Sequence, residues 1–128
     1  MRLQGRVAIV TGGGHGIGRA YVLGLAREGA RVAIAEIDAA AAERVAQEVV
    51  AQGSEALAIP TDVSDEASTR NMARATAERF GGIDILVNNA SIFATIPMSR
   101  VGFEQISVEE WDRLMAVNLK GPWLCARA

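Results

Sequence analysis

The feature that most constrains this chain is a glycine-rich turn, Thr11-Gly12-Gly13-Gly14-His15-Gly16-Ile17-Gly18, which stands between a short apolar run and a helical pattern. Glycines let a turn adopt positive φ and allow another group to approach the backbone closely. Backbone amides at the start of a helix attract anions such as a pyrophosphate. The turn therefore predicts a strand, an anion-binding loop and a helix in succession.

Four apolar runs recur along the chain with helical segments between them, at residues 7–10, 32–35, 56–59 and 83–87. The first three lack polar alternation and the fourth contains only Asp84, which is typical of strands buried on both faces of a parallel sheet. Alternating strands and helices favour an α/β fold with right-handed crossovers and helices on both faces of the sheet.

The segments between and after these runs carry helix signals. Gly29 is expected to end the first helix, a second is expected over residues 38–52, and a third from Ser64 onwards. Ser107 and Glu110 predict a capping box at the start of a fourth helix. The residues expected to form apolar faces are Ile17, Tyr21, Gly24 and Leu25 in the first helix, Met72, Ala73, Ala77 and Phe80 in the third, and Trp111, Leu114, Met115 and Leu119 in the fourth.

A Gly121-Pro122 pair interrupts a segment that otherwise favours a helix. Pro122 has no N–H, so in a helix the carbonyl of Asn118 would lack its usual donor. The chain then stops at Ala128 with no glycine or proline to end the helix. We expect residues 1–128 to be the N-terminal part of one domain, cut after the fourth helix.

Composition excludes several classes of protein. The chain has 128 residues, 50% of them hydrophobic, which suits one domain, and its net charge of −2 mixes both signs without a basic stripe. Residues 1–5 run into a strand-like segment without the apolar region typical of a secretory signal, and no apolar run approaches about 20 residues. The single Cys125 is read as a packing residue. We expect a soluble, cytoplasmic protein that binds neither nucleic acid nor membrane and has no metal site.

Two common glycine motifs are not met. The pattern G-x-G-x-x-G would need glycine at position 17, where Ile17 stands, and a phosphate loop would need Lys-Ser/Thr after Gly18, where Arg19 and Ala20 follow. The spacing is T-G-x-x-x-G-x-G, in which the chain resembles the short-chain dehydrogenase/reductase family. The resemblance continues in order through Asp62-Val63, Asn88-Asn89-Ala90 and Val117-Asn118. The alternative is an unrelated flavodoxin-like sheet with glycine turns and core asparagines.

The resemblance implies a Rossmann-type doubly wound parallel sheet of three αβα layers with strand order 3-2-1-4. It also implies an NAD(P)-dependent oxidoreductase that transfers hydride between nicotinamide and a carbonyl or secondary alcohol. The implied cofactor-binding residues are Gly12, Gly14, His15, Gly16, Ile17, Gly18, Glu36, Ile37, Asp62, Val63, Asn89, Ala90 and Ser91. Ser91 departs from the family's glycine. For Asp62 the alternative to adenine contact is a role at the entry of the next helix.

The acidic residue Glu36 follows the glycines by about 20 residues, where a carboxylate can accept hydrogen bonds from the adenosine ribose and repel a 2′-phosphate. It favours NAD over NADP. Asp38 is a competing candidate that could instead cap the next helix. His15 argues against this preference for NAD, because many NADP-using relatives have a basic residue at this position of the turn. The alternative interpretation of His15 is a polar residue of the turn that lies beside the cofactor without a catalytic role.

Asn118 is the only member of the family's Asn-Ser-Tyr-Lys catalytic group in the chain. In relatives its carbonyl holds a water in a proton relay, and the alternative is a purely structural kink. Tyr21 cannot serve as the catalytic tyrosine, because Leu25 stands where the lysine of a Tyr-x-x-x-Lys pair would be. The 128 residues alone are therefore expected to be inactive.

Partners and rival functions complete the expectations. Phe93, Ile96, Pro97 and Met98 are candidates for an apolar substrate wall or for core packing. Trp111, Met115 and Trp123 are candidates for a subunit contact in a dimer or tetramer, or for packing on the sheet. The rival function is a non-catalytic dinucleotide sensor or interaction domain. The unpaired edge of the fourth strand favours completion by a further segment.

Overall fold

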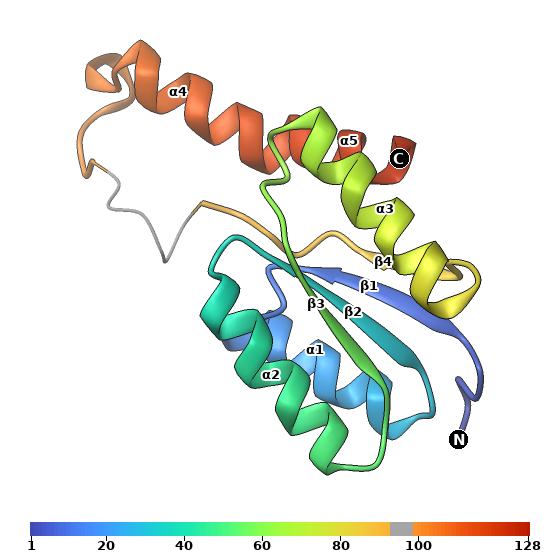
Figure 1. Ribbon diagram of the computed structural model, residues 1–128. Helices are drawn as coiled ribbons and strands as arrows, with labels where there is room; N and C mark the ends of the chain where they lie inside the picture. Colours follow the sequence, from blue (N-terminus) through green and yellow to red (C-terminus); the bar gives the residue numbers. More distant parts are fainter. Residues whose placement is uncertain (93–98) are drawn as a thin grey trace.

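The computed structural model describes residues 1–92 and 99–128, over which strands and helices alternate (Figure 1). The first seven elements are β1 (Val7–Thr11), α1 (Gly16–Arg27), β2 (Arg31–Glu36), α2 (Ala39–Ala51), β3 (Ala56–Pro60), α3 (Glu66–Phe80) and β4 (Ile85–Val87). They are followed by η1 (Phe103–Gln105), α4 (Val108–Met115), η2 (Ala116–Lys120) and α5 (Gly121–Arg127). The four predicted strands are confirmed, although β4 begins two residues later than expected.

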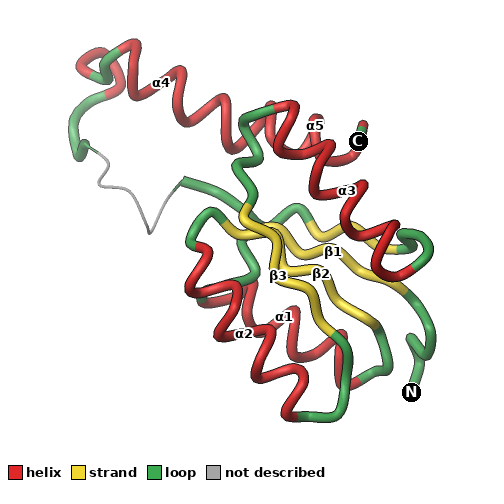
Figure 2. Tube along the Cα trace, viewed as in Figure 1, coloured by secondary structure: helices red, strands yellow, loops and turns green. Residues whose placement is uncertain are grey.

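The strands form one parallel sheet with the order β3-β2-β1-β4. Ala8 of β1 lies between Val32 of β2 and Ile85 of β4, and Val32 in turn pairs with Ala56 of β3. Helices α1 and α2 cover one face of the sheet, while α3 and α5 cover the other (Figures 1 and 2). The predicted Rossmann-type architecture is therefore confirmed. Since all strands are parallel, their carboxyl ends meet at one edge of the sheet.

Two apolar cores lie on the two faces of the sheet. Val10 and Ile34 point towards α1 and α2, whereas Ile9 and Met72 belong to the core beneath α3 and α5. Cys125 is buried in this second core, and desolvation raises the pKa of its thiol to about 11. That pKa keeps the thiol protonated at neutral pH, as suits a packing residue.

The expected burial of the strands on both faces holds for only half of the sheet. Every residue of β1 is buried, and every residue of β2 except Arg31 is buried. Most residues of β3 and β4 are only half-buried. The strand order explains the difference, because β1 and β2 are central whereas β3 and β4 lie at the edges of this sheet.

The predicted apolar face of α1 is wrong. Ile17 and Tyr21 are 67% and 47% exposed, and the buried residues are Gly18, Val22, Leu23 and Ala26. The orientation of α1 follows from the close approach of Gly18 to the glycine turn, which rotates the buried stripe by one residue. In α3 the stripe is also partly wrong: Met72 and Phe80 are buried, but Thr69 and Thr76 replace Ala73 and Ala77.

Buried threonines are tolerated in α3 because their hydroxyls are satisfied. Oγ1 of Thr69 donates to the carbonyl of Glu66 at 2.9 Å, and Oγ1 of Thr76 donates to that of Met72 at 2.8 Å. Such back-bonding removes the cost of burying an unpaired hydroxyl. The ends of the predicted helices hold better: Gly29 and Gly53 follow α1 and α2 with φ of 93° and 84°.

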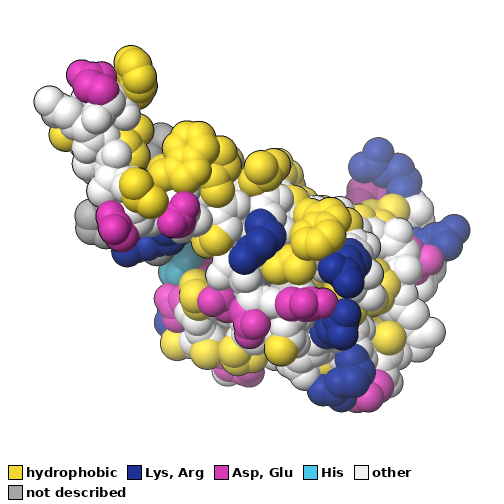
Figure 3. Space-filling model, turned by 90° about the horizontal axis from the view of Figure 1, so that it is seen from above, with side chains coloured by type: hydrophobic (Ala, Val, Ile, Leu, Met, Phe, Trp, Pro, Cys, Tyr) yellow, Lys and Arg dark blue, Asp and Glu magenta, His cyan; other side chains and the backbone are white. Residues whose placement is uncertain are grey.

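The last helical segment runs continuously from α4 through the π-helical η2 into α5. Ser107 accepts from the amide of Glu110, but the reciprocal half of the predicted capping box is replaced, because the Glu110 carboxylate accepts from the amide of Ser99 at 2.9 Å. The expected apolar face does not pack on the sheet. Trp111, Met115 and Leu119 of that face are 55%, 37% and 67% exposed, and Trp123, a candidate for a subunit contact, is 57% exposed. Figure 3 shows hydrophobic side chains along this helix.

No helix within residues 1–92 and 99–128 combines the length and apolar character needed to cross a membrane. The four candidates for a substrate wall, Phe93, Ile96, Pro97 and Met98, lie outside the described residues.

Candidate functional site

The glycine turn brings the start of α1 against the loop that follows β4. Gly12 and Gly16 have φ of 65° and 49°, in the left-handed region that favours glycine. A Cβ at Gly12 would lie 2.9 Å from Cα of Ala90, and one at Gly18 would lie 2.0 Å from the carbonyl oxygen of Gly12. Close backbone contacts thus set the positions of Gly12 and Gly18, and the positive φ of the turn sets those of Gly12 and Gly16.

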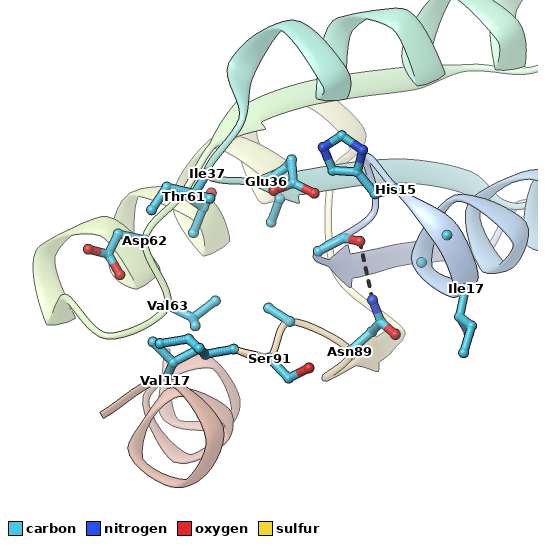
Figure 4. Close-up of a pocket in the computed structure, with 16 residues that line it drawn as sticks. His15, Ile17, Glu36, Ile37, Thr61, Asp62, Val63, Asn89, Ser91 and Val117 are labelled. Atoms are coloured by element: carbon cyan, nitrogen blue, oxygen red, sulfur yellow. Dashed lines mark hydrogen bonds between the residues drawn. The ribbon is translucent and has the colours of Figure 1, made fainter. Parts of the chain in front are cut away.

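Thr11 and Asn89 fasten this turn to the end of β4. Oγ1 of Thr11 accepts hydrogen bonds from the amides of Asn89 and Ala90, both at 3.0 Å. Nδ2 of Asn89 donates to the carbonyl of Gly12 at 3.2 Å, the contact drawn as a dashed line in Figure 4. The sequence marked Asn89 as a cofactor residue but did not predict the role of the Thr11 hydroxyl. The feature of the sequence that could have indicated this role is a threonine at the end of an apolar strand, directly before the glycine turn.

Glu36 occupies the carboxyl end of β2 and is only 7% exposed. Oε1 accepts from the amide of Gly14 at 3.1 Å, and Oε2 accepts from the amide of Asp38 at 3.2 Å. A Cβ at Gly14 would lie 2.8 Å from Cγ of Glu36, so glycine is required for this contact. Each carboxylate oxygen has a further lone pair and can accept a second hydrogen bond. The Glu36 carboxylate is therefore bound by two backbone amides and can still accept hydrogen bonds from a ligand.

His15 and Asp38 form a pair at the rim of the site. Nε2 of His15 lies 3.1 Å from Oδ2 of Asp38, and Oδ1 of Asp38 accepts from the amide of Ala41 at 3.1 Å. The second contact caps α2, as the sequence analysis weighed for Asp38. The Ala41 amide, and after it His15, lowers the pKa of the Asp38 carboxyl. Asp38 is thus a fixed anion between the turn and α2.

Asp62 and Val63 lie at the carboxyl end of β3. Oδ1 of Asp62 accepts from both the amide and the hydroxyl of Ser64, at 2.9 and 2.6 Å. This arrangement is a local turn that leads into α3, so the helix-entry role is present alongside a place in the cavity wall. Val63 is 6% exposed and packs against Gly121, whose Cβ would lie 2.9 Å from Cγ2 of Val63.

Asn118 lies in η2, opposite the loop after β4. Its Oδ1 accepts from the amide of Ile92 at 2.8 Å. Residues 116–120 have π-helical geometry, a feature often found at functional sites, and Pro122 follows in the first turn of α5. The predicted interruption by Pro122 therefore takes the form of a local π segment within a continuous helix.

The four strand ends enclose one cavity of about 420 Å³. Its size falls in the range of small-molecule sites. The predicted cofactor residues that line it are Gly12, His15, Gly16, Ile17, Gly18, Glu36, Ile37, Asp62, Val63, Asn89, Ala90 and Ser91. Figure 4 shows their side chains around a common space. Of the remaining two predicted site residues, Gly14 is buried behind Glu36, and Asn118 is absent from the wall although its neighbour Val117 belongs to it.

Four residues of the wall were not predicted from the sequence: Ala35, Thr61, Ile92 and Val117. Thr61 directly follows β3 and could have been found, since residues just after parallel strands face this edge of the sheet. Val117 belongs to the Val117-Asn118 motif but was not selected as a site residue, and Ile92 is an apolar residue without a motif that only its position in the fold brings to the cavity.

The sheet order and the glycine turn define a Rossmann-type dinucleotide-binding protein. A family model described as short chain dehydrogenase matches residues 6–128. The chain belongs to the short-chain dehydrogenase/reductase family, whose fold binds a nicotinamide dinucleotide and whose members are oxidoreductases.

Individual relatives agree with this assignment. The chain is 46% identical over 121 residues to a sorbitol dehydrogenase of Cereibacter sphaeroides, covering 94% of this chain and 44% of the relative. It is similar to the crystal structure of 3-ketoacyl-(acyl-carrier-protein) reductase from Brucella melitensis complexed with NADH, with 41% identity, a TM-score of 0.88 and coverage of 98% and 48%. It is also similar to the crystal structure of a short chain dehydrogenase from Burkholderia cenocepacia J2315 in complex with NADP. The identity is 39% and the TM-score 0.89, and the match covers 99% of this chain and 50% of the other. The chain spans about half the length of the curated relatives it matches.

Proposed function

We propose that this chain forms the cofactor-binding part of an NAD-dependent oxidoreductase that transfers hydride between nicotinamide and a carbonyl or secondary alcohol. The observation that carries the proposal is the cavity of about 420 Å³ at the start of α1, which is lined from all four strand ends. The sorbitol dehydrogenase relative supports the alcohol class by its name. When bound, the nicotinamide would supply the hydride chemistry, and the protein would supply orientation and proton transfer.

The cavity fits a dinucleotide through its backbone. Glycine at Gly16 leaves open space where a side chain would stand, since a Cβ there meets nothing within 4 Å among the described residues. The first amides of α1 are available for a pyrophosphate, because a helix leaves its first N–H groups without internal partners. Gly16, Ile17 and Gly18 at the start of this helix would hold the phosphates.

The preference for NAD over NADP rests on Glu36. Its buried carboxylate would accept from the ribose hydroxyls and oppose the charge of a 2′-phosphate. The two solved relatives named above carry NADH in one case and NADP in the other, so the preference is argued from this chain's own residue. Asp62 and Val63 would adjoin the adenine, and Asn89, Ala90 and Ser91 the ribose side of the cofactor.

A binding titration tests this preference. NADH should bind about ten-fold more tightly than NADPH, which corresponds to a difference of roughly 1.4 kcal/mol in binding free energy. Glu36→Ala should reduce the difference, whereas Glu43→Gln, which removes a charge from α2 outside the cavity wall, should not. If NADPH bound more tightly and Glu36→Ala left that order unchanged, the role assigned to Glu36 would be wrong.

We propose that Asn118 contributes to proton transfer through its carbonyl oxygen, which lies in η2 where Pro122 offers no N–H. The oxygen would hold a water for a relay. Tyr21 is the only tyrosine of the 128 residues and stands on α1 outside the cavity wall. This chain on its own should therefore bind the dinucleotide without turnover, and it is proposed to be the N-terminal part of the catalytic domain.

Turnover separates the enzyme from its rival, a non-catalytic dinucleotide sensor or interaction domain. The full-length protein should reduce NAD with polyols or other secondary alcohols, or oxidise NADH with carbonyls, when a panel is followed at the absorbance of the reduced nicotinamide. Tight NADH binding without turnover on any member would favour the sensor.

The exposed helix face suggests the oligomeric state. We propose that Trp111, Met115 and Trp123 contribute to a homo-oligomer, a dimer or tetramer, because large apolar side chains exposed along one helix favour a covered surface. Sedimentation of the full-length protein and of Trp123→Ser should show a lower assembly state for the variant. A small-molecule substrate, a cytoplasmic location and the absence of nucleic-acid or membrane partners remain part of the proposal, consistent with the mixed charge and net −2.

A further inference from the structure

The rim of the cavity near Glu36 carries a second acidic residue that does not itself line it. Asp38 faces His15 across the mouth, with Oδ2 at 3.1 Å from Nε2, and the two side chains are 46% and 47% exposed. His15 belongs to the cavity wall, whereas Asp38 does not. Asp38 can therefore act on a bound ligand through its charge or through His15.

Three hydrogen bonds fix this pair. The amide of Asp38 donates to Glu36, Oδ1 accepts from the amide of Ala41, and Oδ2 meets His15. An ionised carboxylate can only accept, so Nε2 of His15 carries the hydrogen in this contact. The charged form of the Asp38 carboxyl is favoured, because the Ala41 amide and His15 lower its pKa. The Nε2–H donor of His15 is thus occupied by Asp38 and held beside the second strand end.

We propose that Asp38 determines cofactor preference through His15, an inference that rests on the proposed dinucleotide site. A 2′-phosphate on the adenosine ribose would place an anion beside Glu36, where the nearest imidazole donor is already bound to Asp38. The carboxylate of Asp38 adds a second negative charge at the same rim. Asp38 is a positioning residue: it withholds His15 from the phosphate and so reinforces the discrimination by Glu36.

The test uses Asp38→Asn, because asparagine caps a helix as well as aspartate does and keeps an acceptor for Ala41. The variant removes the charge and weakens the hold on His15 while preserving the start of α2. NADPH should bind about ten-fold more tightly than to the unmodified protein, while NADH affinity should change by less than about two-fold. Isothermal titration calorimetry on the full-length protein measures both affinities without relying on activity.

A double-mutant cycle distinguishes the action through His15 from a simple loss of charge. In a His15→Gln background, Asp38→Asn should improve NADPH binding by no more than about three-fold. His15→Gln alone should change NADPH affinity by less than about two-fold, because Asp38 already occupies the imidazole. Glu43→Gln removes an equal charge from the same helix outside the cavity wall and should leave both affinities unchanged.

The outcomes separate this inference from the proposed function. If NADH binds and Asp38→Asn leaves the ratio of NADPH to NADH affinity unchanged, the inference is wrong and the proposed function stands. An equal gain in NADPH affinity with and without His15 also overturns the action through the imidazole. If the unmodified protein binds neither dinucleotide, both fail. Should Asp38→Asn unfold α2, His15→Gln still decides: a large loss of NADPH affinity would show that Asp38 does not withhold the ring.

Discussion

Oδ1 of Asn118 accepts a hydrogen bond from the backbone amide of Ile92 at 2.8 Å, which joins η2 to the loop after β4. Ile92 is 5% exposed, and this contact gives its backbone amide an acceptor. Sequence reasoning selected Asn118 for its carbonyl oxygen and did not anticipate the side-chain contact. The residue thus has a structural task that is separate from the proposed relay.

Asn118→Ala should release the amide of Ile92. Loss of one hydrogen bond is worth about 1 kcal/mol, so amide exchange at Ile92 should accelerate about five-fold. Hydrogen exchange followed by NMR or mass spectrometry measures it. Lys120→Ala, at an exposed position in the same π segment, is the matched control and should leave exchange at Ile92 unchanged. Equal acceleration in both variants would show that the helix, and not the Asn118 side chain, protects the amide.

Thr11→Val should lower the free energy of unfolding by about 1 to 2 kcal/mol, because the amide of Ala90 loses its acceptor and the amide of Asn89 keeps only the carbonyl of Val87. Thr11 is 1% exposed, and valine preserves its shape and strand preference. Thr76→Val is the control. Thr76 is equally buried, but its hydroxyl only donates to a helix carbonyl, so its removal should be close to neutral. Urea titrations of both variants give the comparison, and equal losses would count against the role of the Thr11 hydroxyl.

The close approach at Gly18 gives a second paired test. Gly18→Ala should cost about 3 kcal/mol and weaken dinucleotide binding, because the new Cβ overlaps the carbonyl oxygen of Gly12. Gly24→Ala, in the same helix, meets nothing within 4 Å among the described residues and should stabilise the protein by about 0.5 to 1 kcal/mol. Thermal unfolding and NADH titration report both effects. A stabilised Gly18→Ala variant that still binds NADH would contradict the packing of the turn.

The sequence of strands and helices was predictable because it depends on apolar runs and turn chemistry, which are local, whereas the strand order was implied by the family resemblance. The face of α1 was not predictable, because apolar spacing alone favours Ile17 and Tyr21 over the smaller Gly18 and Ala26. Tertiary contact with the glycine turn decides between the two stripes. In α3, apolar spacing alone favours Ala73 and Ala77, but a threonine whose hydroxyl bonds its own helix can be buried in their place.

The cavity wall was largely predictable because family motifs mark strand ends, and strand ends meet in a parallel sheet. What the motifs could not supply is the way side chains divide their hydrogen bonds. Glu36 was selected for a ligand, but both its oxygens also hold the backbone of the turn. Asp38 was weighed as a rival to Glu36 and as a helix cap, and its contact with His15 depends on a fold that no short motif encodes.

Acid should weaken the fold through Asp84, which joins the starts of β1 and β4. Oδ2 accepts from the amide of Val7 at 2.8 Å and Oδ1 from Arg6 at 3.2 Å, and these donors, the Val7 amide first, lower the pKa of Asp84. A lowered folded-state pKa contributes stability above the ordinary aspartate pKa of about 3.9, and the contribution is lost as pH falls through the folded-state value. Asp84→Ala should therefore be less stable than the unmodified protein at neutral pH, and the gap between their urea midpoints should shrink as pH falls below about 4. Asp112→Ala, at an exposed position of α4, should show no such convergence. A gap for Asp84→Ala that stays constant from neutral to acid pH would mean that the Asp84 charge contributes nothing to joining the two strands.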